Sequence, residues 1–205
     1  MKSYPSIPRQ PKGKQGDRRM HIFDKLDGSN LRFEWSRREG WVRWGSRHQV
    51  IDETHPILGG GLALFRERLA EPIERVARAE RWDALVAFAE LFGPGSLGGQ
   101  HVAGEPKRLV LFDVAPYRRG MIGPARFLEL FGTLEVPAYL GEVVWDDDLV
   151  ARVRRGELPG VTFEGIVGKA GDGHGLVMAK AKTEAWVRRI LERYGEDEGG
   201  RIVDS

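Results

Sequence analysis

The strongest constraint on the fold is that the predicted strands follow one another in hairpins. From His21 onward, short runs that alternate apolar and polar residues are separated by glycine-containing turns: HIFDKLDG, NLRFEW and GWVRWGSR. Further along the chain, VTFEGIVGKA and LVMAKAK flank the turn GDGHG and predict another hairpin. Because strands joined by tight turns run antiparallel, the pattern predicts an α+β fold of antiparallel sheets flanked by helices.

Helical spacing is confined to a few segments. LALFRERLAEPIERVARAERW is expected to form two helices divided near Pro72, and TEAWVRRILERYG a helix capped by Thr183 and ended by Gly195. GPARFLELFG and DDDLVARVRRG are also predicted to be helical. A chain of 205 residues suits a single domain. We therefore expect a basic irregular arm at residues 1–19, one folded domain at 20–195 and an acidic tail at 196–205.

Composition excludes several kinds of site. The chain contains no cysteine, which excludes disulfides, thiolate nucleophiles and cysteine-based zinc sites. None of the five histidines has the spacing of a helical zinc site, so any metal should be a hard cation bound through oxygen. The sequence contains no apolar run long enough to span a bilayer and no apolar signal-peptide core, so we expect a cytoplasmic protein without a membrane partner.

Cations are concentrated near the start of the chain although the net charge is only +2. This distribution predicts a polyanionic partner. The residues concerned are Arg9, Lys12, Lys14, Arg18, Arg19, Arg32, Arg37, Arg38, Arg43 and Arg47.

A set of short motifs carries the chemistry. They are Lys25-Leu-Asp27-Gly-Ser-Asn30, Ser46-Arg47, Glu90 in AFAELFG, Phe112-Asp113 in LVLFDVA, Glu164-Gly-Ile-Val and Lys180-Ala-Lys182. In this order they resemble the covalent nucleotidyltransferases, the superfamily of ATP-dependent RNA and DNA ligases and mRNA capping enzymes. The details look most like the RNA ligase 2 branch. The resemblance extends from about His21 to Lys182, so residues 20–195 would be the adenylation domain.

The resemblance implies a covalent mechanism. Lys25 would take AMP from ATP as a lysyl-AMP adduct and release pyrophosphate. Lys180 and Lys182 would contact the α-phosphate, and Glu164 would help hold Mg²⁺ or Mn²⁺. The remaining nucleotide contacts that it implies are Asp24 to the adenine amino group, Glu90 to the ribose hydroxyls, Phe112 to the adenine face, Arg47 to phosphate, and Asp27 and Asn30 beside the lysine.

Elementary chemistry is consistent with this assignment. An amine attacks phosphorus only when it is unprotonated, and a neighbouring cation lowers the pKa of a lysine. Lys180 and Lys182 share one face of a strand, so we expect them to lower the pKa of Lys25.

Other interpretations remain for several of these residues. Glu90 could form a structural salt bridge, Phe112 could be a core residue, and the Lys180 and Lys182 pair could be a solvated strand face. A glycine-rich match to a dinucleotide-binding motif begins at Gly93. Gly99, Gly104 and Pro106 prevent the helix that such a motif needs, so this segment is expected to be a hairpin loop.

We therefore expect a polynucleotide ligase for RNA repair that joins RNA 3′-OH and 5′-phosphate ends, with RNA, including a nicked duplex, as its partner. The alternatives are a DNA or mixed nick-sealing ligase, and a nucleotide- or RNA-binding module that no longer seals. Only 23 residues follow Lys182, which leaves no room for an appended OB-fold. Substrate would then be bound by the core, the arm or a partner chain.

Overall fold

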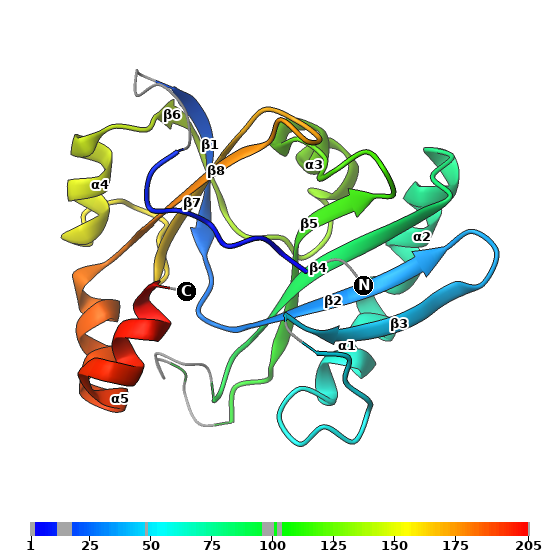
Figure 1. Cartoon of the computed structure of the whole chain (residues 1–205), viewed down its shortest axis with the longest axis horizontal. Coiled ribbons are helices and arrows are strands. Elements are labelled where there is room, and N and C mark those ends of the chain that lie inside the picture. Colours follow the sequence, from blue (N-terminus) through cyan, green and yellow to red (C-terminus); the bar gives the residue numbers. More distant parts are fainter. Residues whose placement is uncertain (1–2, 12–17, 48, 96–100, 102–103, 205) are drawn as a thin grey trace.

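Two antiparallel sheets of four strands each form the framework, in the orders β6-β1-β7-β8 and β3-β2-β4-β5 (Figure 1). The computed structural model describes residues 3–11, 18–47, 49–95, 101 and 104–204. The predicted α+β fold of antiparallel sheets is confirmed. The strands are β1 (Arg19–Lys25), β2 (Ser29–Ser36), β3 (Gly40–Ser46), β4 (Ala84–Phe92), β5 (Arg108–Pro116), β6 (Tyr139–Val144), β7 (Gly165–Ala170) and β8 (Val177–Lys182).

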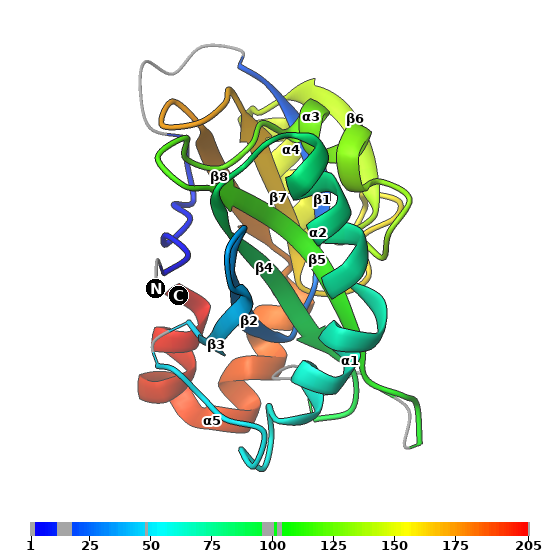
Figure 2. The same ribbon diagram turned by 90° about the vertical axis from the view of Figure 1, so that its right-hand side faces the viewer.

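Two helices, α1 (Gly60–Arg68) and α2 (Ala70–Ala79), cover one face of the sheet that contains β2, β4 and β5 (Figure 2). Alternation along β2 directs Leu31, Phe33 and Trp35 into the core under these helices. The helices separate at Leu69 as predicted, and Pro72 lies in the first turn of α2, where a missing N–H costs no helical hydrogen bond. A third helix, α3 (Pro124–Phe131), adds Phe127 and Phe131 to the same core.

Helix α4 (Asp147–Arg154) packs on the other sheet. Its Leu149 and Val153 join a second core with Ile22, Ile166 and Ala179. Asp146 caps the helix, since its carboxylate accepts the backbone N–H of Leu149 at 2.7 Å. Residues 146–148 therefore mark a helix N-terminus, as predicted.

A buried ion pair joins the two sheets. Lys169 Nζ on β7 lies 2.8 Å from Asp113 Oδ2 on β5. Tyr4 Oη donates a hydrogen bond to the same oxygen at 2.5 Å, and the Tyr4 ring packs edge-on against Phe88 of β4. Tyr4 is only 8% exposed, so the described part of the predicted arm begins between the sheets rather than in solvent.

Both ends of the described chain pack against β8. The backbone N–H of Lys180 donates to the carbonyl of Pro8 at 2.9 Å. Helix α5 (Glu184–Asp204) begins at its predicted cap, Thr183, and is interrupted at Gly195 (φ 74°, ψ 175°). The acidic segment 196–204 continues as a second helical half, which brings the C-terminal end back to β8. No helix in the described residues has the length and apolarity needed to cross a membrane.

Candidate active site

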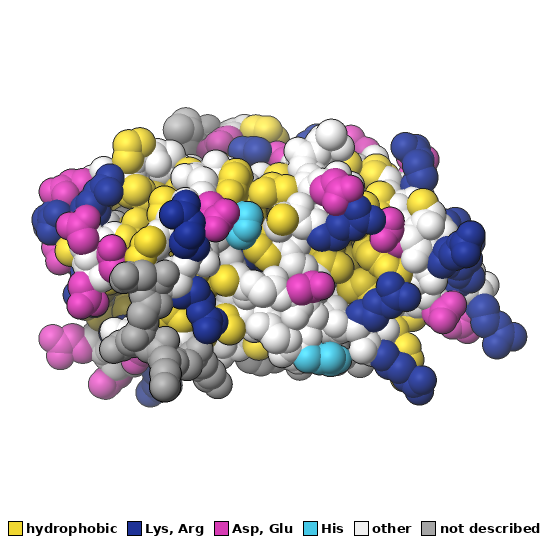
Figure 3. All heavy atoms as spheres, turned by 90° about the horizontal axis from the view of Figure 1, so that it is seen from above, with side chains coloured by type: hydrophobic (Ala, Val, Ile, Leu, Met, Phe, Trp, Pro, Cys, Tyr) yellow, Lys and Arg dark blue, Asp and Glu magenta, His cyan; other side chains and the backbone are white. Residues whose placement is uncertain are grey.

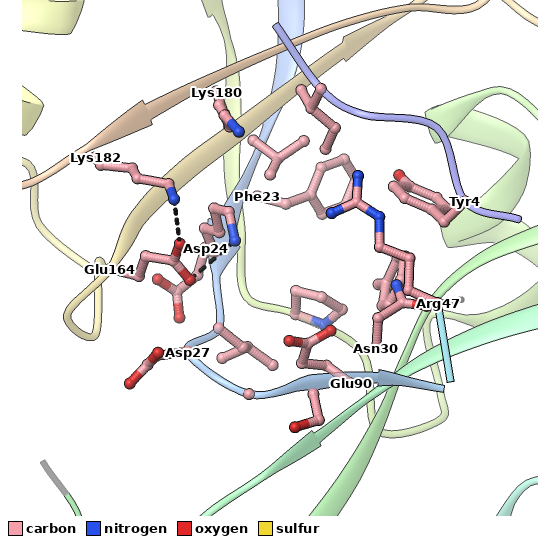
Figure 4. Close-up of a pocket in the computed structure, with 18 of the residues that line it drawn as sticks. Tyr4, Phe23, Asp24, Asp27, Asn30, Arg47, Glu90, Glu164, Lys180 and Lys182 are labelled. Atoms are coloured by element: carbon pink, nitrogen blue, oxygen red, sulfur yellow. Dashed lines mark ion pairs between the residues drawn. The ribbon is translucent and has the colours of Figure 1, made fainter. Parts of the chain in front are cut away.

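The residues singled out from the sequence line one cavity. It has a volume of about 360 Å³, which is within the range of small-ligand sites, and it lies between the two sheets (Figure 4). All ten predicted nucleotide-binding or catalytic side chains contribute to its wall. They are Asp24, Lys25, Asp27, Asn30, Arg47, Glu90, Phe112, Glu164, Lys180 and Lys182.

Strand register brings together the residues closest to Lys25. Lys25 pairs with Gly165 across β1 and β7, and Gly165 pairs with Lys182 across β7 and β8. The three strands therefore end side by side. Glu164, which precedes Gly165, has one carboxylate oxygen 2.9 Å from Lys25 Nζ and the other 3.1 Å from Lys182 Nζ. Glu164 is thus held between the two ammonium groups.

A glycine is required at position 165. Its φ is +149°, and a Cβ there would lie 2.0 Å from the carbonyl oxygen of Ala181. Any side chain would therefore push β7 away from β8 where Glu164 and Lys182 meet.

The expected lowering of the Lys25 pKa is wrong for this arrangement. Burial lowers the pKa of Lys25, but the carboxylates of Glu164, Glu90 and Asp27 outweigh burial and raise it above its ordinary value. Lys25 is therefore an ion-paired ammonium, and it must lose a proton before it can act as a nucleophile.

The two lysines on β8 have lowered pKa values instead. Burial, together with the neighbouring charges of Lys182 and Lys25, lowers the pKa of Lys180 to about 8. Burial also lowers the pKa of Lys182, although Glu164 opposes this effect. Lys180 is 3% exposed, so a solvated strand face is not what the structure shows. Two cations held in a cavity wall are suited to neutralising a phosphate.

Glu90 enters the cavity from β4, where it pairs with Asn30 of β2. Burial is the main reason that its pKa is raised, to about 8. It accepts the backbone N–H of Gly28, and a Cβ at Gly28 would come within 2.8 Å of the Glu90 Cγ. Within the described residues Glu90 forms no ion pair, so the alternative of a structural salt bridge is not supported. In its protonated form this carboxyl can both donate to and accept from a hydroxyl.

The two aspartates that flank Lys25 are also buried. Asp24 precedes Lys25 at the end of β1, and both residues line the cavity. Both of its oxygens accept hydrogen bonds from Thr162, from the backbone N–H at 3.0 Å and from the hydroxyl at 2.9 Å. Asp27 is 4% exposed and adds negative charge beside Lys25. The predicted contact between Asp24 and an adenine amino group stays a prediction.

Aromatic side chains form the opposite end of the cavity. Phe112 is partly buried, and the Tyr4 ring meets it edge-on with centroids 4.9 Å apart. The Lys169 ammonium donates to the Phe112 carbonyl at 2.8 Å. Phe112 is therefore both packed and exposed to the cavity, which agrees with both interpretations of it.

Arg47 extends its guanidinium into the cavity toward Tyr4 (Figure 4).

Tyr4, Lys169 and Ile202 also line the cavity, and sequence reasoning missed them as site residues. A lysine in the apolar strand GIVGKA was a usable signal, because a buried charge needs a partner. No local pattern distinguishes Tyr4 or Ile202, which reach the cavity from the two ends of the chain.

The described side chains of this cavity do not by themselves supply enough donor atoms to hold a metal ion. Among the described residues no group of three His, Asp or Glu side chains could hold a metal ion. Glu164 offers one carboxylate, and both of its oxygens are in ion pairs. This donor set fits a Mg²⁺ or Mn²⁺ ion that receives most of its ligands from nucleotide phosphates and water.

Many of the predicted basic residues are ion-paired. Arg19 pairs with Glu142, Arg43 with Glu34, and Arg9 with Asp204. Arg32 is buried and donates to Ser3, while Lys12 and Lys14 lie outside the described residues. Figure 3 shows acidic and basic side chains interspersed on one face rather than a field of one sign.

No protein-family model and no curated protein match the sequence. In structure the chain is similar to the Naegleria gruberi RNA ligase. With the form solved with PPi, the TM-score is 0.68 at 16% identity, over 96% of this chain and 58% of that one. With a mutant solved with AMP and Mn, the TM-score is 0.65 at 15% identity, over 95% and 58% of the two chains. With another mutant, solved with ATP and Mn, it is 0.62 at 17% identity, over 87% and 52%.

The chain thus spans between half and three fifths of the length of the RNA ligase chains that it matches. At these identities the likeness concerns the fold and not the activity. The chain therefore shares the α+β fold of these RNA ligases.

Proposed function

We propose that this chain is an ATP-dependent RNA ligase of the RNA ligase 2 type, which joins RNA 3′-OH and 5′-phosphate ends through a lysyl-AMP intermediate on Lys25. The observation that carries the proposal is the grouping of Lys25, Glu164 and Lys182 at the adjoining ends of three strands, inside a cavity of nucleotide size. The solved neighbours that contain ATP, AMP and Mn support a nucleotide and a divalent cation as ligands. Residues 20–195 would be the adenylation domain.

In the first step the Lys25 amine forms a bond to the α-phosphorus of ATP, and the bond to the pyrophosphate oxygen breaks. The ammonium must first give up a proton, and the carboxylate of Glu164, 2.9 Å away, is within reach to accept it. Lys180 and Lys182 would then face the α-phosphate and stabilise the charge that develops on it. A bound Mg²⁺ or Mn²⁺ would supply further neutralisation of the phosphates.

The base and ribose would occupy the rest of the cavity. Phe112 offers an aromatic face for the adenine, and Glu90 offers a carboxyl for the ribose hydroxyls. In the second step AMP would pass to the RNA 5′-phosphate. In the third, the 3′-OH would attack that phosphorus and expel AMP.

The test is covalent labelling. Purified protein is incubated with Mg²⁺ and ATP labelled on the α-phosphate and separated on a denaturing gel, beside Lys25→Ala and Lys107→Ala. Label on the wild type and on Lys107→Ala, but not on Lys25→Ala, is expected, because the Lys107 ammonium donates to the carbonyl of Ile57 and Lys107 is not among the described residues that line the cavity. A labelled Lys25→Ala protein would refute the assignment of the nucleophile.

Nicked duplexes then test the substrate. The sealing rate is compared for nicks that differ only in RNA or DNA on the 3′-OH side, and faster sealing of the RNA form is expected. Equal sealing of both would favour a mixed nick-sealing ligase. Labelling without any sealing would mean that adenylylation alone has been kept.

A further inference from the structure

The last turn of α5 lies on the lysines that are proposed to bind phosphate. Lys180 Nζ donates to the backbone carbonyl of Asp204 at 3.2 Å, and Lys182 Nζ donates to that of Ile202 at 3.4 Å. The carboxylate of Asp204 pairs with Arg9 at 2.5 Å. Three cations thus bind a single helical turn at the end of the cavity.

A second, smaller cavity adjoins these same groups. It has a volume of about 150 Å³ and shares Lys180 and Lys182 with the larger cavity, and Arg9 and Arg154 line it as well. Four basic side chains therefore line the smaller cavity, and two of them also line the larger one. This concentration of positive charge suits an anion.

The last turn of α5 presents partly negative oxygen atoms to these cations, as a bound anion would. The last carbonyls of a helix have no partner within the helix, and the helix dipole places negative charge at this end. The segment 196–204 also contains four acidic residues and only one basic residue. Carbonyl oxygens of this turn therefore accept from the two lysine ammonium groups, and the Asp204 carboxylate pairs with the Arg9 guanidinium, as phosphate oxygens would.

We propose that the last turn of α5, residues 202–204, competes with phosphate groups for Lys180, Lys182 and Arg9, and that Arg9 is a further phosphate-binding residue. The inference rests on the proposed function for the source of the phosphate, which is either the nucleotide or the 5′ end of a polynucleotide. The turn then holds the phosphate-binding end of the site closed until a phosphate displaces it.

The contacts that hold the turn suit displacement. The Arg9 and Asp204 side chains are 63% and 72% exposed, and an ion pair so exposed contributes little stability. Gly195 separates this half of α5 from the first half with φ of 74°, and its surroundings are open, since a Cβ there would meet nothing within 4 Å. The second half packs on the first at the buried Gly199, against Ile190 and Leu191, so displacement concerns the turn beyond it, residues 202–204.

Equilibrium binding tests the competition. Dissociation constants for inorganic pyrophosphate, α,β-methylene ATP and adenosine are measured by calorimetry for the wild type, for Asp204→Asn and for a chain that ends after Arg201. Asp204→Asn should bind the two phosphate-containing probes about two- to five-fold more tightly, the range expected from loss of one exposed ion pair. The shortened chain should gain more, and adenosine should bind all three proteins equally.

Two matched variants complete the design. Asp197→Asn makes the same charge change at an exposed position of the same segment and should leave all three dissociation constants unchanged. In the shortened chain Asp204 is removed, so the Arg9 guanidinium can pair with pyrophosphate instead. Arg9→Gln made in that chain should therefore weaken pyrophosphate binding.

Unchanged or weaker phosphate binding in both Asp204→Asn and the shortened chain would overturn the proposal and make the turn a fixed wall of the site. An equal gain for adenosine would overturn it too, because it would indicate general opening rather than competition. Pyrophosphate binding needs no transfer of AMP, so its result is independent of whether Lys25 becomes labelled. The same proteins are also titrated with an RNA oligonucleotide that carries or lacks a 5′-phosphate. A gain for pyrophosphate and for the 5′-phosphorylated RNA, with none for α,β-methylene ATP, would identify the polynucleotide end as the source.

Discussion

Lys169 on β7 and Asp113 on β5 form an ion pair of 2.8 Å whose side chains are only 6% and 1% exposed, and this pair links the two sheets that enclose the cavity. Replacing one partner of a buried pair leaves an uncompensated charge. Lys169→Met should therefore lower the free energy of unfolding by about 3–5 kcal/mol, measured by urea denaturation. The control is Glu157→Gln, which breaks an exposed pair with Arg155 and should cost less than about 1 kcal/mol. Similar losses for the two variants would contradict a structural role for the buried pair.

Gly165→Ala should disrupt the meeting point of β7 and β8, because the added Cβ would lie 2.0 Å from the Ala181 carbonyl oxygen. We expect loss of AMP labelling together with a marked fall in the urea midpoint. Gly40→Ala is the matched control, since Gly40 also has a positive φ, +73°, but has open space around it. It should lose only about 1–2 kcal/mol from backbone strain and keep its labelling. Full activity of Gly165→Ala would show that the strands can separate there without harm.

Glu90 should make stability depend on pH. Its pKa is raised from 4.5 to about 8, chiefly by burial, so between these values the folded chain holds a proton that the unfolded chain has lost. The contribution of Glu90 to the free energy of unfolding is therefore fully present below about pH 4.5 and is lost as the pH rises through about 8. Relative to Glu90→Gln, the wild type should become progressively less stable across this interval in urea titrations. A constant difference between the two proteins would show that Glu90 ionises normally.

Lys180 should make phosphate binding depend on pH. Burial and two neighbouring lysines lower its pKa to about 8, so its positive charge is lost as the pH rises through that value. The dissociation constant for pyrophosphate should therefore increase between about pH 7 and about pH 9. Arginine stays protonated in this range, so Lys180→Arg should show a weaker pH dependence. Parallel curves for the two proteins would assign the pH effect to another group.

Much of the fold follows from local patterns. The hairpins β2–β3 and β7–β8, the division of α1 from α2 and the caps at Asp146 and Thr183 depend on residues close in sequence, and they were predictable for that reason. The predicted hairpin of β1 with β2 is wrong, since these two strands lie in different sheets. The motif residues were also predicted as one group, because their order along the chain resembles that of the covalent nucleotidyltransferases. Their roles toward a nucleotide remain predictions.

Other features were decided by contacts between distant parts of the chain. The pKa of Lys25 depends on Glu164 and Glu90, which approach it only through strand register, and their charges reverse the expected direction of the shift. Asp24 accepts hydrogen bonds from Thr162, which is 138 positions away along the chain.

The sequence by itself determined most of the strands and the limits of most helices, because periodicity, turns and caps act over a few residues, although α5 continues past its predicted end at Gly195. Only the tertiary structure decided the Lys169 and Asp113 pair, the entry of Tyr4 between the sheets and the return of α5 to Lys180. These contacts join residues 56, 109 and 24 positions apart. Burial and charge at such points depend on which surfaces meet when the sheets close, and no local pattern specifies that.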